Sequence, residues 1–213
     1  MSPLWRDEVG IFLGPGKVVL ARMRRGVRPK CTAEQGVIVE NAHAGDWRPT
    51  CAALQEQLEN KLWQNANARL VISDHWARFA VVPWSRELSR DSERMAHARH
   101  ILANTYGDVI DQWTISISDS PPHAPAIVSA VPSEFLNDLR QLMSAPQLRV
   151  VSLQPHLIVA YNAWRGHLPD TPAWFASIDD GLLAAMHLTN GHCDRVRSVR
   201  ISDDWTVEIR RVQ

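Results

Sequence analysis

The sequence has few cysteines, no excess charge of either sign and no long apolar run. Its three cysteines, Cys31, Cys51 and Cys193, are far apart and form no C-x-x-C pair, which indicates free thiols in a reducing compartment. Basic and acidic residues number 23 each, so charge provides no general attraction to nucleic acid or to an anionic membrane. No stretch approaches the roughly 18 apolar residues that span a bilayer, and the N-terminus lacks a signal peptide's apolar core. We expect a cytoplasmic chain that has no membrane span and binds no nucleic acid.

What the chain does contain is a regular succession of strand and helix patterns over its 213 residues. Pro15 between two glycines predicts a tight turn between two strands, and Asp46 is placed to cap the first helix. Gly107 is placed to stop the second helix. The first part is predicted to contain strands at 9–13, 17–25 and 35–41, a helix at 47–63, two strands around 73–75 within 68–84, a helix at 85–106 and a strand at 111–119.

The order of elements changes after residue 125. Strands at 126–132 and 148–155 alternate with helices at 133–145 and 156–164, which predicts parallel strands joined by crossover helices. Residues 165–172 resemble a linker. Four successive strands are predicted after it, at 173–179, 181–189, 195–202 and 205–212. We therefore expect a first lobe over 1–165 and a second, mostly stranded lobe over 173–213.

This order, three strands followed by alternation and then a second hairpin, resembles the actin-like ATPase superfamily. Three stretches carry the likeness: 69–88, with its Pro-Trp before a long helix, 126–164 and 174–202. They are most similar to the PilM-like and GspL-like proteins beneath type IV pili and type II secretion platforms. The resemblance implies an α/β fold of the actin-like (ribonuclease H-like) type, with mixed sheets, flanking helices and a truncated second lobe that is mostly β.

The resemblance also implies a nucleotide site made of two Gly-containing hairpin turns, each with an acidic residue that orients Mg²⁺. The second turn fits the Asp-x-Gly pattern, but the first has Phe12 in place of the carboxylate, and we expect the adenine-binding region to be missing. We expect degenerate phosphate turns, no cofactor and no catalytic residue, with residues 179–181 forming a plain hairpin turn. The residues of these turns are Gly14, Gly16, Lys17, Asp179 and Gly181.

Other candidate chemistry is outweighed by simpler interpretations. His97 and His100 share a helical spacing but have no third ligand nearby, so a solvated face is favoured over a metal site. Asp74 and His75 are expected to serve turn formation rather than catalysis. A basic cluster suits an acidic partner or lipid headgroups, although a solvated edge is the default. Its members are Arg22, Arg24, Arg25, Arg28 and Lys30.

The nine tryptophans favour a protein that acts through contacts, because tryptophan is enriched at buried interfaces. Trp205, Val207 and Ile209 alternate along the last predicted strand and form the expected interaction surface, for a partner or for a homodimer. The leading hypothesis is a catalytically inactive scaffold of a pilus or type II secretion platform, held at the inner face of the inner membrane through partners. Two alternatives stay open: a nucleotide-binding actin-like ATPase with a degenerate site, and a dimerising domain of another pathway.

Overall fold

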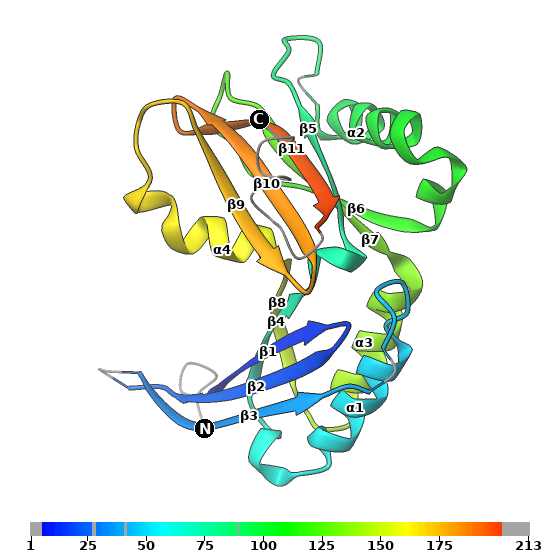
Figure 1. Ribbon diagram of the computed structural model, residues 1–213, viewed down its shortest axis with the longest axis vertical. Helices are drawn as coiled ribbons and strands as arrows, with labels where there is room; N and C mark the ends of the chain where they lie inside the picture. The colour runs from blue at the N-terminus through cyan, green and yellow to red at the C-terminus, as the bar shows by residue number, and fades with distance from the viewer. Residues whose placement is uncertain (1–5, 27–28, 41, 89, 202–213) are drawn as a thin grey trace. The chain divides into compact units, whose positions relative to one another are not determined.

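The computed structural model describes residues 6–26, 29–40, 42–88 and 90–201, which form a mixed α/β chain with three separate sheets (Figure 1). The chain divides into two compact units, residues 1–76 with 135–156, and residues 77–134 with 157–213. These units do not coincide with the ranges 1–165 and 173–213, and that division into lobes stays a prediction. Among the described residues, no helix is both long and apolar enough to cross a membrane.

The first unit is built on a five-stranded sheet of order β3-β2-β1-β4-β8. The first three strands form an antiparallel meander, and β4 and β8 run parallel to β1. On β1 the alternate residues Val9, Ile11 and Leu13 are completely buried, as expected for one face of a strand against a core. The strands are β1 (Glu8–Gly14), β2 (Lys17–Arg24), β3 (Lys30–Ile38), β4 (Asn67–Ile72) and β8 (Arg149–Pro155).

Helices α1 (Arg48–Leu58) and α3 (Ser133–Ser144) lie side by side next to this sheet (Figure 1). The buried residues of α1 recur every three or four positions, which is the pattern that predicts the helix. Asp46 accepts a hydrogen bond from the Arg48 backbone N–H at 3.0 Å, although the N-cap position of the helix is held by Trp47 and not by Asp46 as predicted. The observed helix is shorter than the predicted range 47–63, because Asn60 redirects the chain into a 3₁₀ turn, Lys61–Trp63.

The second unit contains a three-stranded antiparallel sheet of order β5-β7-β6, with β5 (Arg78–Val82), β6 (Trp113–Ile117) and β7 (Ala126–Pro132). Helix α2 (Asp91–Tyr106) packs on it through Ala98 and Leu102, and it starts later than predicted. The helix ends at Gly107, whose φ of 73° is the left-handed conformation that glycine allows. One 3₁₀ turn, Asp74–Trp76, precedes β5, and another, Gly107–Gln112, connects α2 to β6.

One topological prediction is wrong. Residues 126–132 and 148–155 were expected to be parallel strands of one sheet, but β7 pairs antiparallel with β5 and β6 while β8 pairs with β4. Helix α3 therefore connects strands of two different sheets. Residues 77–134 form an insertion between β4 and α3, and the sequence pattern of the strands carries no information on which sheet each joins.

The remaining sheet of the second unit is antiparallel, with β10 (Leu182–Thr189) between β9 (Ala173–Asp179) and β11 (His192–Arg200). Its central strand is the most buried, because it has a neighbour on each side. Helix α4 (His156–Trp164) and the 3₁₀ turn Arg165–His167 precede it. The strand predicted at 205–212, and with it Trp205, Val207 and Ile209, lies outside the described residues.

Candidate functional site

The first candidate phosphate turn joins β1 to β2. Gly14 pairs with Lys17, so only Pro15 and Gly16 form the loop. Neither Gly14 nor Gly16 adopts a left-handed φ, so the turn does not use the conformational freedom of glycine. Three backbone carbonyls hold the turn in place: Leu13 O accepts from Ser73 N at 2.7 Å, Gly14 O from Thr50 Oγ1 at 3.0 Å, and Gly16 O from Val39 N at 2.9 Å.

The aromatic ring of Phe12 covers this turn. A β-carbon added at Gly14 would lie 3.0 Å from Phe12 Cε1, so the ring already occupies the space next to the glycine. Lys17 Nζ lies 5.1 Å from the centre of the same ring, a cation–π distance, and His156 contacts it edge-on at 5.7 Å. Pro15 has no backbone N–H to donate to a phosphate. The residues present therefore do not fit a magnesium-bound phosphate at this turn.

The second candidate turn joins β9 to β10 in the other unit. Asp180 and Gly181 have φ values of 45° and 75°, the type I′ geometry that matches the twist of a two-residue hairpin. Gly181 O accepts a hydrogen bond from Ile201 N at 2.8 Å. The Asp179 side chain is only 5% exposed and pairs in register with Leu182. The geometry is that of the hairpin turn expected for residues 179–181.

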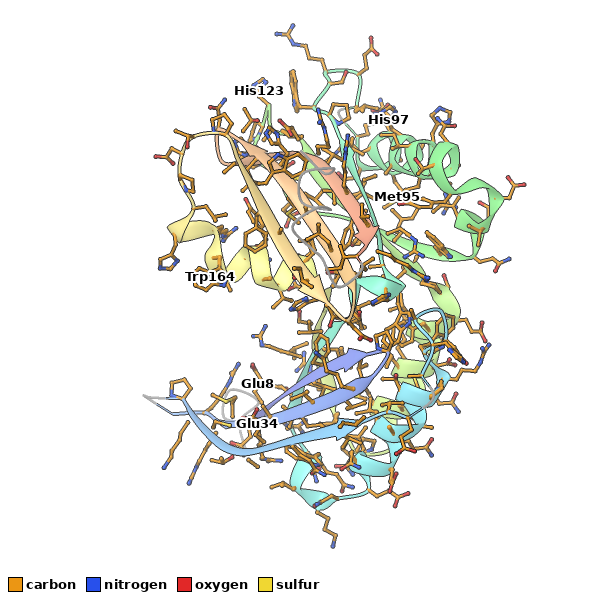
Figure 2. The ribbon with its side chains drawn as sticks, in the orientation of Figure 1. Glu8, Glu34, Met95, His97, His123 and Trp164 are labelled. Carbon is orange, nitrogen blue, oxygen red and sulfur yellow. The ribbon has the colours of Figure 1, made fainter. Side chains whose placement is uncertain are left out.

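The histidine pair considered from the sequence lies on α2, and Asp74 and His75 lie in the 3₁₀ turn before β5. His97 is half-buried on α2 (Figure 2), and His100 Nε2 lies 3.1 Å from Asn104 Nδ2. Asp74 is buried at the start of its 3₁₀ turn. Among the described residues, no group of three potential ligands is placed to hold a metal ion.

The basic cluster is partly structural. The solvated-edge interpretation is wrong for Arg22, which is 18% exposed, forms an ion pair with Asp7 at 2.9 Å and donates to the backbone of the 61–64 region. Glu8, labelled on β1 in Figure 2, accepts from Arg69 at 2.7 Å and pairs with Arg25 at 3.4 Å. These contacts link β2 and β4 to the start of β1. Arg28 lies outside the described residues.

A cavity of about 740 Å³ lies between α1 and α3, with Arg48, Glu59 and Asp138 in its lining. Cys51 lies in the same lining. Burial, together with the nearby carboxylates of Asp138 and Asp46, raises the pKa of its thiol to about 12. Cys51 is consequently protonated at neutral pH and is not an activated nucleophile. Burial also raises the pKa of the Cys193 thiol to about 12.

A polar cluster that the sequence did not reveal lies on the β10–β11 hairpin. His187 Nδ1 lies 2.7 Å from Asp194 Oδ1, and Thr189 Oγ1 donates to Asp194 Oδ2 at 2.7 Å. Desolvation alone would raise the pKa of the Asp194 carboxyl, but the hydrogen bonds from Thr189 and His187 outweigh it and hold the pKa below its usual value. The hydroxyl of Thr189 is bound to the carboxylate, so the group is not arranged as a nucleophile activated by histidine.

We expect acid to weaken this hairpin. The folded-state pKa of the Asp194 carboxyl is below its usual value, so its contribution to stability is present at neutral pH and is lost as the pH falls through the folded value. The difference in melting temperature between the wild type and Asp194→Asn should therefore shrink as the pH falls from about 5 into the range in which the Asp194 carboxyl becomes protonated. Thermal unfolding followed by circular dichroism measures this. Asp170→Asn, at an exposed position, is the control, and a difference that grows in acid would contradict the prediction.

No protein-family model and no curated protein sequence matches the chain. Among solved structures it is similar to the cytoplasmic domain of EpsL, an inner-membrane component of the type II secretion system of Vibrio cholerae. That pair is 12% identical, with a TM-score of 0.62, over 91% of this chain and 71% of that one.

The chain is also similar to a structure of the PilM–PilN type IV pilus biogenesis complex, at 17% identity and a TM-score of 0.65, over 96% of this chain and 65% of that chain. A third match is a Bacteroides thetaiotaomicron protein with an actin-like ATPase fold, at 11% identity and a TM-score of 0.63, over 98% of this chain and 76% of that one. This chain thus spans about two thirds to three quarters of the length of these three chains. These similarities confirm the expected actin-like α/β fold, and the resemblance to PilM-like and GspL-like proteins is confirmed as a likeness in fold.

Proposed function

We propose that the chain is a catalytically inactive actin-like scaffold that acts by protein–protein contacts in an inner-membrane assembly platform for pili or type II secretion. It would work in the cytoplasm, at the inner face of the inner membrane, where its partners hold it. The similarity in fold to EpsL and PilM supports the assembly role, since their structures are described as a type II secretion component and part of a pilus biogenesis complex.

The observation that carries the inactivity is the position of Phe12. An actin-like phosphate turn needs open backbone amides for the phosphate oxygens and an oxygen ligand for hydrated Mg²⁺. The Phe12 ring occupies the space next to Gly14, and the ammonium of Lys17 lies near the ring centre. A phosphate at this turn would have to displace the Phe12 ring. The free energy needed to displace a packed side chain is subtracted from the binding free energy of the phosphate, so we expect weak affinity.

The alternative function, a nucleotide-binding ATPase with a degenerate site, is supported by the second turn. Asp179 and Gly181 keep the Asp-x-Gly pattern, and the Asp179 carboxyl is buried next to the turn. A type I′ hairpin with Asp and Gly at its end is also the commonest short reversal between strands, so the turn has a sufficient structural reason. We therefore prefer the scaffold.

Copurification from the native cell tests the assembly role. A tagged full-length chain should sediment with the inner-membrane fraction and, after mild crosslinking, copurify with components of a pilus or secretion platform. Salt or alkaline extraction should release it from the membrane, because partners rather than a membrane span hold it. An untagged strain is the control. Recovery in the soluble fraction with copies of itself alone would instead support a dimerising domain of another pathway.

A further inference from the structure

A cavity of about 400 Å³ opens at the end of the β5-β7-β6 sheet, within the second unit. Its walls come from the segment 83–88 that follows β5, from the loop between β6 and β7, and from α2. The residues that give it its character are Pro83, Trp84, Arg86, Arg94, Pro121 and Pro122. Three prolines make the walls stiff, so little conformational entropy is lost when a ligand enters.

Trp84 lies on the surface at this cavity, with 43% of its area exposed. The buried core beneath it is formed by other residues, among them Val82, Leu102 and Val128, so the core does not require the indole. The Trp84 ring contacts His123, with ring centres 4.3 Å apart and ring planes tilted by 54°. A half-exposed indole held by a second ring is the type of anchor that dominates binding energy at protein interfaces.

The backbone at His123 is strained to place that second ring. Ala124 N donates to Pro121 O at 3.1 Å, which closes a turn with Pro122 and His123 at its centre. The φ of His123 is 68°, so this is a turn of the type that prefers glycine or asparagine at its third position. His123 is labelled on this loop in Figure 2. A histidine in this conformation costs conformational energy, and such strain clusters at binding sites.

The charged side chains in the wall are both arginines. Arg86 is exposed and makes no hydrogen bond or ion pair with another described residue. Arg94 has one long ion pair, 3.9 Å to the fully exposed Asp91. No carboxylate belongs to the described lining of the cavity. The cavity thus combines an apolar aromatic anchor with two cations available for carboxylates, and guanidinium groups bind carboxylates with two parallel hydrogen bonds.

We propose that this cavity docks an acidic segment of a partner protein, in which one apolar side chain stacks on Trp84 and neighbouring carboxylates pair with Arg86 and Arg94. The proposal deepens the scaffold function and rests on it, because a protein that acts by contact needs such a docking site. It adds the chemistry of the partner: an extended, acidic segment with an apolar residue among its carboxylates.

Short synthetic peptides test the proposal on the full chain. An array is made with leucine, proline or tyrosine between glutamates, and each peptide has a matched version in which glutamine replaces glutamate. The chain should bind members of the acidic set more tightly than their amide versions, and fluorescence anisotropy then gives the affinity of the peptide that binds most tightly.

Trp84→Ala should weaken the affinity for this peptide at least about tenfold, and Arg86→Gln and Arg94→Gln should each weaken it several-fold. Added salt should weaken binding to the wild type more than binding to Arg86→Gln.

Matched variants separate the cavity from general effects. Trp164→Ala removes an indole that is more exposed, 59%, and that also contacts a histidine, but lies outside the cavity. Arg90→Gln removes an exposed arginine that is not in the lining. Neither should change the affinity.

Three results would overturn the docking proposal. They are binding of no acidic peptide, equal affinity of Trp84→Ala and the wild type, and binding of single-stranded DNA or anionic vesicles through Trp84 in place of the peptides. If no peptide binds while the chain still copurifies with an inner-membrane platform, this docking site is wrong and the scaffold function stands. If the peptides bind but no platform component copurifies, the scaffold assignment fails and the docking chemistry stands.

Discussion

Replacing Phe135 by alanine should lower the free energy of unfolding by about 3–5 kcal/mol. The Phe135 side chain is completely buried, and its ring packs against Trp47 with ring centres 5.3 Å apart and against Trp76 at 5.0 Å. Trp47 is itself fixed, because its Nε1–H donates to Asp138 at 2.9 Å. Because Trp47 is fixed by this hydrogen bond and Trp76 is itself buried, we expect the space left by the phenyl group to collapse only in part, which puts the cost toward the upper end of the range. Urea unfolding measures it.

Phe175→Ala is the matched control, because Phe175 is only half-buried and contacts a single ring, that of Tyr161. Its loss should be clearly smaller. Equal losses for the two variants would show that the aromatic cluster around Phe135 does not stabilise the first unit as described. The location makes the test informative: Phe135 lies in the first turn of α3, where the chain returns to the first unit after the insertion.

The individual elements of this fold were largely predictable from the sequence. Apolar alternation predicts β1 through Val9, Ile11 and Leu13, and the three-to-four spacing of Cys51, Leu54 and Leu58 predicts α1. Gly107 ends α2 for the expected reason. These signals are local, since each reflects one face of one element packing on a core.

The sheet partners were not predictable in the same way. Residues 126–132 have the composition of a buried strand whether they pair with β8 or with β5 and β6, so the alternation with helices led to the wrong partner. Pairing depends on contacts between residues far apart in the chain. The direction of β7 could be established only from the fold.

The same reason explains the functional features that the sequence did not show. His187 and Asp194 come together only because β10 and β11 pair, and Trp84 meets His123 only because two loops converge. Phe12, by contrast, was identified from the sequence because the family pattern has a carboxylate there. The structure adds the physical consequence, a ring that occupies the space beside Gly14.

Calorimetric titration of the full chain with ATP and Mg²⁺ tests the central claim that the chain acts by contact rather than through a nucleotide. We expect a dissociation constant weaker than about 1 mM, which corresponds to a binding free energy weaker than about −4 kcal/mol. Asp179→Asn should give the same result as the wild type, because on this interpretation Asp179 is part of a hairpin and does not orient a magnesium ion. Asp180→Asn is the matched control in the same turn, since asparagine tolerates its positive φ of 45°. Micromolar affinity that is lost in Asp179→Asn and kept in Asp180→Asn would contradict the account and establish a working nucleotide site.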